Sequence, residues 1–436
     1  MRPAPCPTPE ELLHEVWHFP LLEAVFGRRS RRFGLGMEIP DGPLAFRSRH
    51  PPLSELERTL LIAAATGVSG WHFGIPYTPA ESPGGCSYSL RYPGRPFPSG
   101  AGIHPSELFF TDDSGIYLTK LRDVPPRRLR EVETVADVEQ VLARCRQALV
   151  RLQDTRLALP RQAPHISEHN LWNANVPGSV LFLPMADLSE YCLARLCIRV
   201  VNGYYLYDNL AGRPCGDLEP FIRSGLLQES RRVWLSSFEH DALSHASIEL
   251  GTMGQTLVLV LQAMGLGGWL FTGIHPPSAM GAFAAQGIRG LGFRFAHRND
   301  WPGPNPVVLD GHFEGYCPPY FPDMREAARQ FVRGKFGPGG TYDPDTPGPF
   351  LRTSEVKSQV KPYSEEFIAC LGEMAQYIYD IYGKFPATIP TIFMRVCVQA
   401  HHLDAEFYDS HFQKGAYLET HAQHLARWHP RAGDDR

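Results

Sequence analysis

The chain has 436 residues, more than one average domain, so we expect one large domain or two smaller ones. Hydrophobic residues make up 43% of the sequence and charged residues 20%, which is typical of a soluble globular protein. The formal net charge of -4 lacks the basic excess with which proteins attract nucleic acid or an anionic membrane surface. We therefore expect no nucleic acid and no membrane among its partners.

Cysteine usage and the first residues indicate a cytoplasmic protein. The nine cysteines are scattered and form no C-x-x-C pair, as expected in a reducing compartment. The opening segment, MRPAPCPTPEELLHEVWHF, lacks the apolar core of a signal peptide. The longest apolar stretch, residues 256–274, contains Gln262 and four glycines. It falls short of the roughly 20 apolar residues of a membrane span.

Turn signals and apolar periodicity predict the elements of the first part of the chain. A helix over 7–26 is followed by a second helix that begins at Ser54, where Ser54 and Glu57 form a capping box, and stops at Gly67. The later predictions are, in chain order, a long functional loop over 76–106, a hairpin over 107–121 and a helix over 134–157.

The remaining elements predict an α+β protein rather than a doubly wound parallel sheet. They are, in chain order, strands at 180–183 and 197–201 with a helix at 187–196 between them, a strand near 204–207, an apolar helix at 248–264 that ends at Gly265, a strand at 268–274, a Pro- and Gly-rich connection over 299–350, and helices near 364–382 and 391–428.

Four arginines and a serine are clustered at Arg28-Arg29-Ser30-Arg31-Arg32. The forked donors of arginine match the oxygens of a phosphate, so this cluster is a candidate phosphate site. A solvated basic turn is the alternative that the spacing leaves open.

Two glycine-containing segments are the other candidates for contact with a ligand. Pro98-Ser99-Gly100 lets the backbone approach a flat ligand closely, although a plain turn explains the segment better when it is taken alone. Gly265-Leu266-Gly267-Gly268 follows a helix and precedes a strand, whereas a dinucleotide fingerprint runs from strand through glycines to helix. The order therefore argues against a Rossmann site and favours a turn that ends the helix.

Taken in this order, the segments resemble the nitroreductase family of flavoproteins. Arg28-Arg29-Ser30-x-Arg32 is similar to the Arg-x-Ser-x-Arg/Lys phosphate motif of that family, and Pro52-Leu53-Ser54 is similar to the helix start that follows it. The segment 95–110, RPFPSGAGIHPSELFF, resembles a conserved stretch of the SagB-type azoline dehydrogenases, which oxidise thiazolines and oxazolines in peptide natural products. The likeness spans about residues 20–298.

This resemblance implies an α+β, nitroreductase-like fold, with a mixed central sheet flanked by helices in a homodimer that holds FMN between its subunits. It implies a nitroreductase-like domain over 1–298, a connection over 299–350 and a helical C-terminal extension over 351–436. The residues that it assigns to FMN are Arg28, Arg29, Ser30, Arg32, Pro98, Ser99, Gly100, Gly267, Gly268 and Arg298.

The implied activity is hydride transfer between FMN and a small-molecule or peptide-derived substrate of a biosynthetic pathway, with NAD(P)H or dioxygen as the other electron partner. No catalytic residue is assigned. Of the family's Asn-x-Gln-Pro-Trp segment only the aromatic is kept, as Trp71. A flavin-free scaffold protein of the same fold is therefore an alternative.

A metal-dependent enzyme is the third hypothesis, based on the histidines near the C-terminus. On a helix, His402 and Glu406 would be i, i+4 neighbours, and His421 and His424 would be i, i+3 neighbours, so each pair has ligand spacing. The H-E-x-x-H order is missing and no third ligand is evident, so the sequence assigns no metal site.

Overall fold

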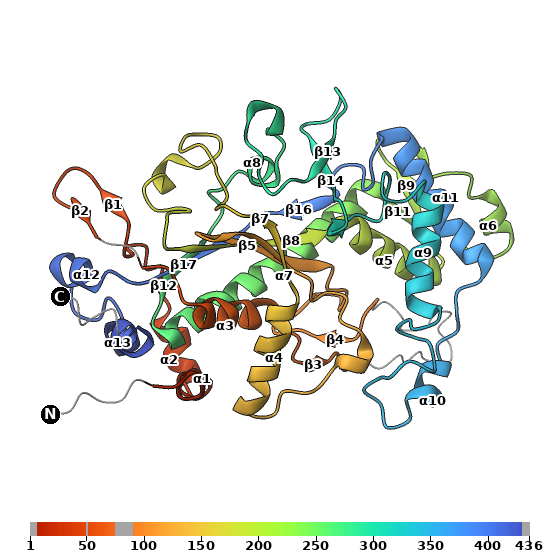
Figure 1. The fold of residues 1–436 in the computed structure, drawn as a ribbon. Coiled ribbons are helices and arrows are strands. Elements are labelled where there is room, and N and C mark those ends of the chain that lie inside the picture. The colour runs from red at the N-terminus through yellow and green to blue at the C-terminus, as the bar shows by residue number, and fades with distance from the viewer. Residues whose placement is uncertain (1–6, 49–50, 75–89, 430–436) are drawn as a thin grey trace.

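A seven-stranded antiparallel sheet forms the centre of the protein (Figure 1). The computed structural model describes residues 7–48, 51–74 and 90–429. The strand order is β12-β17-β8-β5-β6-β7, and β16 also pairs with β8. These strands are β5 (Ser106–Asp112), β6 (Gly115–Thr119), β7 (Leu149–Gln153), β8 (Val180–Asp187), β12 (Gly267–Phe271), β16 (Ile392–Met394) and β17 (Cys397–His401).

The predicted α+β class is confirmed, but the prediction of a mixed central sheet is wrong. Every strand pair described in the main sheet is antiparallel. One reason is the tight turn between Asp112 and Gly115, since only antiparallel strands can be joined by so short a connection. A parallel pair occurs instead in a small sheet made of β9 (Tyr205–Asp208), β10 (Arg213–Pro214) and β11 (Arg232–Trp234).

Both faces of the sheet are buried. Successive side chains on a strand point to opposite faces, so each strand contributes to two cores. Leu108 and Phe110 of β5 pack with the helices on one face, whereas Phe109 lies in the core on the other face. The helices of the first face are α3 (Glu55–Thr66), α4 (Val135–Gln147) and the second half of α7 (Leu235–Met264). The second face is covered by long connections and by the sheet of β13 (Arg294–Ala296), β14 (Asn305–Leu309) and β15 (Phe313–Glu314).

A helical layer packs around the first half of α7, at the right of Figure 1. It consists of α5 (Leu188–Val201), α9 (Met324–Phe336) and α11 (Glu365–Tyr382). With 30 residues, α7 is about 45 Å long and therefore reaches both this layer and the sheet. None of the described helices combines the length and apolar composition that crossing a membrane requires.

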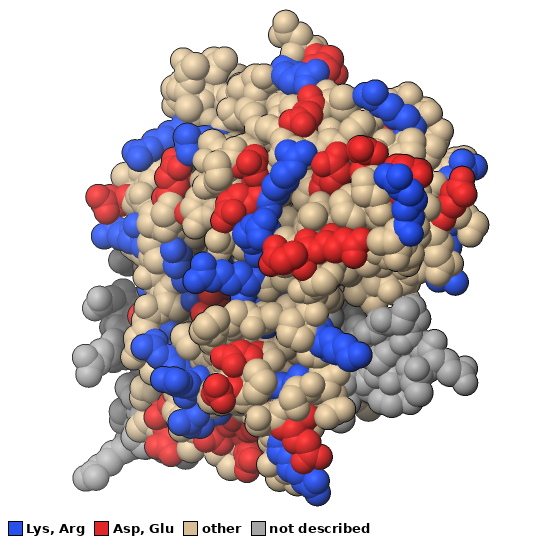
Figure 2. Space-filling view, turned by 90° about the vertical axis from the view of Figure 1, so that its right-hand side faces the viewer, with Lys and Arg blue, Asp and Glu red and all other residues tan. Residues whose placement is uncertain are grey.

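The remaining helices lie at the periphery. They are α1 (Pro9–Trp17), α2 (Leu21–Gly27), α6 (Glu219–Arg223), α8 (Pro276–Met280), α10 (Thr353–Ser358), α12 (Ala405–His411) and α13 (Glu419–Trp428). On the face that carries α6, α9 and α11, basic and acidic side chains are interspersed (Figure 2). Arg325 pairs there with Glu373 at 2.9 Å, and Arg329 with Glu365 at 3.0 Å. This face therefore shows paired charges rather than one region of a single sign.

Several predicted elements are confirmed. The capping box of Ser54 and Glu57 starts α3, and Gly67 ends it. Gly265 ends α7 in the left-handed conformation, with φ at +77°. The predicted loop over 76–106 falls partly outside the described residues, and residues 90–105 of it contain only the two-residue strand β4 (Pro93–Gly94), which pairs with β3 (Gly70–Trp71).

Other predicted boundaries are wrong. The helix expected over 7–26 is divided into α1 and α2 because Pro20 has no N–H for a helical bond and disfavours helical geometry in the residue before it. Residues 197–201 continue α5 instead of forming a strand, although their composition of Cys, Ile and Val favours a strand. The helix expected over 134–157 stops at Gln147, and β7 follows. The connection expected over 299–350 contains β14, β15 and α9.

The C-terminal region is not a separate helical extension. Residues expected in a helix over 391–428 include β16 and β17, and β17 lies inside the main sheet between β12 and β8. Val398 pairs with both Leu270 and Phe182. A division of the chain at residue 298 therefore cuts through one sheet.

This arrangement predicts that a fragment of residues 1–298 does not fold on its own. Without β17, one edge of β8 and one edge of β12 lose their backbone partners, and unpaired strand edges promote association between chains. We expect the fragment to aggregate or to unfold without a cooperative transition in a thermal melt followed by circular dichroism. The intact chain should unfold cooperatively under the same conditions. A monomeric fragment with a sharp transition would contradict this prediction.

Candidate functional site

The basic segment, residues 28–32, is fixed to the edge of the main sheet by Arg31. The backbone of Arg31 exchanges two hydrogen bonds with Gly268 of β12, at 3.1 and 2.9 Å. Its guanidinium is 2% exposed and donates to the carbonyls of Gly27 and Ala416, both at 3.0 Å, and to the side chain of Gln262. Burial lowers the pKa of Arg31 to about 10, so it remains charged at neutral pH. Arg31 is therefore a structural anchor.

The neighbours of Arg31 project to the opposite side, since adjacent residues of an extended segment alternate. Ser30 and Arg32 are exposed, and Arg28 is half-buried. In the described part of the chain neither Arg28 nor Arg32 forms an ion pair with a carboxylate. Arg29 instead donates to the carbonyls of Phe26, at 2.9 Å, and Arg28, at 2.8 Å. The segment thus presents unneutralised cations and a hydroxyl on a fixed backbone.

The C-terminal segment holds the other end of this basic segment. The ring of Phe33 stacks on Phe407 of α12, with centroids 4.2 Å apart. Gly34 pairs with Leu403, and the N–H of Leu35 donates to the carbonyl of His402 at 2.9 Å. Residues 31–35 are therefore held between β12 and the connection that follows β17. The basic segment is rigid because two distant parts of the chain fix it.

Gly268, one of two glycines that the resemblance assigns to FMN, pairs with Arg31 of this segment, and Gly267 directly precedes it. Close packing explains why both are glycine. A Cβ on Gly267 would lie 2.6 Å from the ring of His401, and one on Gly268 would lie 2.2 Å from the carbonyl oxygen of Gln399. The structure thus brings Gly267, Gly268 and the basic segment together. Their contact with a cofactor stays a prediction.

Pro98, Ser99 and Gly100 pack against α7, nearer its N-terminus than Gln262. The carbonyl of Pro98 accepts a hydrogen bond from Thr252 at 3.3 Å, and a Cβ on Gly100 would lie 2.7 Å from the ring of His245. Thr252 precedes Gln262, the partner of Arg31, by ten residues, or about 15 Å along the helix axis. Within one chain, α7 therefore connects the two predicted ligand-binding segments.

A buried carboxyl group, Glu249 of α7, lies beneath the segment 98–100. Glu249 is fully buried, and Ser106 Oγ donates to its Oε1. The hydroxyl of Ser99 also faces this carboxyl group, and both this hydroxyl and the second oxygen of Glu249 are buried. Burial raises the pKa of Glu249 to about 7, against the smaller lowering effects of the hydrogen bonds from Ser106 and Ser99. Glu249 is therefore able to gain or lose a proton near neutral pH.

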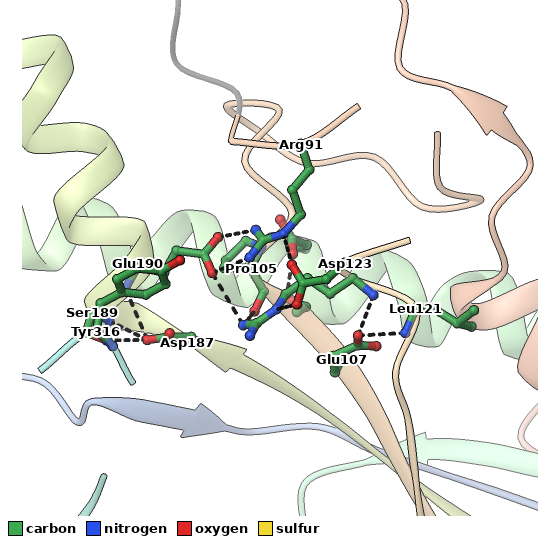
Figure 3. Close-up of polar contacts among 12 residues, drawn as sticks. Arg91, Pro105, Glu107, Leu121, Asp123, Asp187, Ser189, Glu190 and Tyr316 are labelled. Carbon is green, nitrogen blue, oxygen red and sulfur yellow. Dashed lines mark hydrogen bonds and ion pairs between the residues drawn. The ribbon is translucent and has the colours of Figure 1, made fainter. Parts of the chain in front are cut away.

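A buried ionic network anchors the chain on either side of this segment (Figure 3). Arg91 donates to Asp123 and binds Glu190 of α5 with both terminal nitrogens, one of them at 2.9 Å. Arg122 lies 3.4 Å from the second oxygen of Glu190. The carboxylate of Glu107 accepts the backbone N–H groups of Leu121, at 2.8 Å, and Arg122. These contacts tie residue 91, the connection after β6 and the start of α5 into one unit.

Carboxyl groups outnumber guanidiniums in this buried region. Its arginines are Arg91, Arg95 and Arg122, and its buried acidic residues are Glu107, Asp187, Glu190 and Glu249, whereas the side chain of Asp123 is 68% exposed. Burial, together with the negative charge of Glu190, raises the pKa of Asp187 to about 7. Asp187 caps α5 by accepting the N–H groups of Ser189, at 2.9 Å, and Glu190, at 3.1 Å. Burial also raises the pKa of Glu107, and the pKa values of Asp187 and Glu249 lie near neutrality.

Arg298 does not join the basic segment. Its guanidinium pairs with Asp300 at 2.8 Å and donates to the carbonyl of Ile381 at 3.2 Å. It therefore lies against the end of α11, in a part of the molecule separate from α2 and β12 (Figure 1). Within one chain, Arg298 and Arg28 are therefore too far apart to bind the same phosphate group.

The helical i, i+4 spacing that was considered for His402 and Glu406 does not occur, because His402 follows β17 and precedes α12 rather than lying on a helix. His421 and His424 do share α13. His421 turns to the N–H of Leu418, at 3.3 Å, whereas His424 faces Glu57 at 2.7 Å. The sequence analysis did not associate Glu57 with these histidines, because its only local signal is the capping box.

Comparisons with known proteins add little to this description. No protein-family model matches the sequence, and no curated protein matches it. Among solved structures, one similar chain is a "putative nitroreductase" from Ralstonia eutropha JMP134. The two chains are 11% identical, the TM-score is 0.28, and the match covers 59% of this chain and 71% of the other. A likeness of this size does not establish a shared fold.

The raised pKa of Glu249 predicts a loss of stability as the pH increases. Between an ordinary glutamate pKa near 4.5 and the folded-state value of about 7, the folded protein holds a proton that the unfolded chain has released. The free energy of unfolding therefore falls over this range and then levels off. Glu249→Gln keeps the acceptor for Ser106 and removes the titration, so its stability should fall less, by roughly 1–3 kcal/mol at pH 8.

Denaturant unfolding at pH 5, 6.5 and 8 measures this difference, with exposed Glu229→Gln as the matched control. Glu229→Gln should follow the pH profile of the unaltered protein. If the Glu249→Gln profile is parallel to that of the unaltered protein, Glu249 does not titrate in this range.

Proposed function

We propose that this protein is an FMN-dependent oxidoreductase that transfers hydride between the flavin and a small-molecule or peptide-derived substrate. The observation that carries the proposal is the basic segment, where Arg28, Ser30 and Arg32 are free of carboxylate partners while Arg31 fixes their backbone. A fixed cluster of arginines with a hydroxyl is suited to a phosphate dianion, because charge-assisted hydrogen bonds need no reorganisation of the site.

The residues present fit the phosphate end of FMN. Arg28 and Arg32 supply positive charge, Ser30 supplies a hydroxyl, and β12 supplies a backbone without side chains at Gly267 and Gly268. Pro98, Ser99 and Gly100 are proposed to lie against the rest of the cofactor. When bound, FMN would supply the hydride chemistry. Glu249, beneath this segment, would hold or release a proton close to the segment that we assign to the cofactor.

The substrate class and the cellular setting are also proposals. The resemblance of residues 95–110 to SagB-type dehydrogenases supports a peptide-derived heterocycle of a biosynthetic pathway, and NAD(P)H or dioxygen would be the second electron partner. The seven described cysteines are free and buried, which fits a cytoplasmic protein.

FMN titration of the purified protein tests the cofactor directly. Each of Arg28→Ala and Arg32→Ala removes a charge-assisted contact worth about 1.5–3 kcal/mol, so each should weaken FMN binding roughly 10- to 100-fold. The loss should be confined to the phosphate, so both variants should bind riboflavin as the unaltered protein does. Calorimetry or flavin fluorescence measures both affinities.

Arg127→Ala is the matched control, since it removes one exposed arginine from another part of the surface. It should leave the affinity for FMN unchanged. A protein that takes up no FMN, or that binds FMN and riboflavin equally well, would falsify the proposed phosphate site. A protein that takes up neither flavin would leave the flavin-free scaffold as the better hypothesis.

We also propose that the functional unit is a homodimer in which α2 contacts the second subunit. Leu21, Leu22 and Phe26 of α2 are 69%, 66% and 72% exposed, an unusual concentration of large apolar side chains on one short helix. Because Arg28 directly follows this helix, a subunit bound there would also border the basic segment.

Sedimentation or light scattering tests this interface. Phe26→Glu places a charge in the middle of the apolar surface and should convert the dimer to a monomer. Leu210→Glu, which alters an exposed leucine elsewhere, should remain dimeric. A monomeric unaltered protein, or a dimer that tolerates Phe26→Glu, would show that α2 is not the contact.

A further inference from the structure

Four side chains from distant parts of the sequence converge in the core beside α3. They are Glu57 of α3, His402 after β17, His424 of α13 and His429, which ends α13. Each offers one ligand atom, and these atoms all lie within 4.8 Å of one another. Glu57 and His402 have fully buried side chains, and those of His424 and His429 are 2% and 17% exposed.

The rear nitrogens of two of the histidines are occupied by backbone carbonyls. His424 Nδ1 lies 2.7 Å from the carbonyl oxygen of Met264, and His402 Nε2 lies 3.3 Å from that of Pro52. A carbonyl oxygen only accepts, so both of these nitrogens carry the hydrogen. In a neutral ring the other nitrogen then has a lone pair. Metal-binding histidines are oriented in this way, by donating their second N–H to a carbonyl or carboxylate.

The front nitrogens of these rings face the carboxylate of Glu57. His424 Nε2 lies 2.7 Å from Oε1 of Glu57, and His402 Nδ1 lies 3.9 Å from the same atom without a hydrogen-bond partner. His429 Nε2 lies 3.0 Å from Oε2. Neutral imidazole lone pairs and a carboxylate repel one another, so the arrangement requires either extra protons or a cation between them.

The capping box directs the carboxylate. Oε2 of Glu57 accepts the backbone N–H of Ser54 at the start of α3, which leaves Oε1 turned toward His402 and His424. In the described part of the chain, no arginine or lysine forms an ion pair with Glu57. A buried carboxylate without such a partner is costly unless it binds a cation.

We propose that Glu57, His402, His424 and His429 bind one zinc-class divalent metal ion as a structural site. Three imidazoles and one carboxylate suit zinc, whereas magnesium and calcium prefer sites made of oxygen atoms. Ligand atoms of a tetrahedral zinc site lie about 3.3 Å apart, given bonds of about 2.0–2.1 Å, so each ligand here needs to move by less than about 1 Å. Four protein ligands leave no open position for a substrate.

The site connects the two ends of the chain. Glu57 comes from the N-terminal part and all three histidines from the last 35 residues, so the metal fastens α13 and the connection after β17 to α3. This role is independent of the proposed flavin chemistry, because it concerns the stability of the fold and uses none of the residues that we assign to FMN.

Metal analysis and thermal unfolding of the full-length protein test the proposal. The protein should bind about one equivalent of zinc, and removing the metal with a chelator should lower the Tm by about 3 °C or more, with recovery when zinc is restored. Cobalt in place of zinc should give the strong visible absorption of a tetrahedral ion. The probes are zinc and cobalt salts alone, with no flavin present.

Three single variants and one control assign the ligands. Glu57→Gln, His402→Gln and His424→Gln should each weaken zinc binding at least about 100-fold and abolish the chelator effect. His421→Gln removes another buried histidine from α13, one that turns to Leu418 instead, and should keep one equivalent of zinc. If a ligand variant does not fold, the cobalt spectrum of the unaltered protein decides the coordination.

The proposal is overturned if the unaltered protein takes up less than about 0.2 equivalents of zinc and cobalt. It is also overturned if bound cobalt is octahedral, or if the ligand variants and His421→Gln bind zinc equally well. Any of these results would make the cluster a set of hydrogen bonds between protonated histidines and Glu57.

Discussion

The backbone pairing of β17 on both of its edges is the constraint on which the rest of this structure depends. Five residues, 397–401, join β8 to β12, and both of these neighbours are also in contact with α7. Every residue of β17 is buried, so the strand supplies side chains to both cores at once. The C-terminal region is thereby part of the main domain. The backbone hydrogen bonds of β17 also fix the positions of the residues on either side of it.

The basic segment shows what this placement achieves. Arg31 pairs with β12, and residues 33–35 pair with the chain that leaves β17. These two supports fix the backbone of Ser30 and Arg32, and the guanidinium of Arg32 also lies over the ring of Trp269, 6.0 Å from its centroid. At the other end of α7, the excess of buried carboxyls around Arg91 and Arg122 leaves Glu249 and Asp187 with raised pKa values. One helix thus connects a cationic surface to a buried group that exchanges protons.

The sequence predicted correctly those features that depend on interactions between neighbouring residues. The capping box at Ser54, the turn at Asp112 to Gly115 and the helix end at Gly265 all depend on a few adjacent residues, and all three are confirmed. Residues 197–201 have a strand-like composition but are helical, and residues 397–401 were expected in a helix but form β17, because tertiary packing outweighs propensity. The pattern of four arginines likewise gave no sign that Arg31 alone points inward. Glu57 and His424 are separated by 367 residues, and no spacing rule relates them.

The position of β17 near the end of the chain also orders the events of biosynthesis. When the ribosome has translated residues 1–390, the residues of β8 and β12 have been made. Those of β17, which pairs with both strands, have not. Domains that complete their sheet early can fold during translation, whereas this one has to keep two adjoining strand edges apart from other nascent chains until residues 397–401 are made. The interval is one in which a chaperone that shields apolar strands would act, and slow translation after residue 270 would lengthen it.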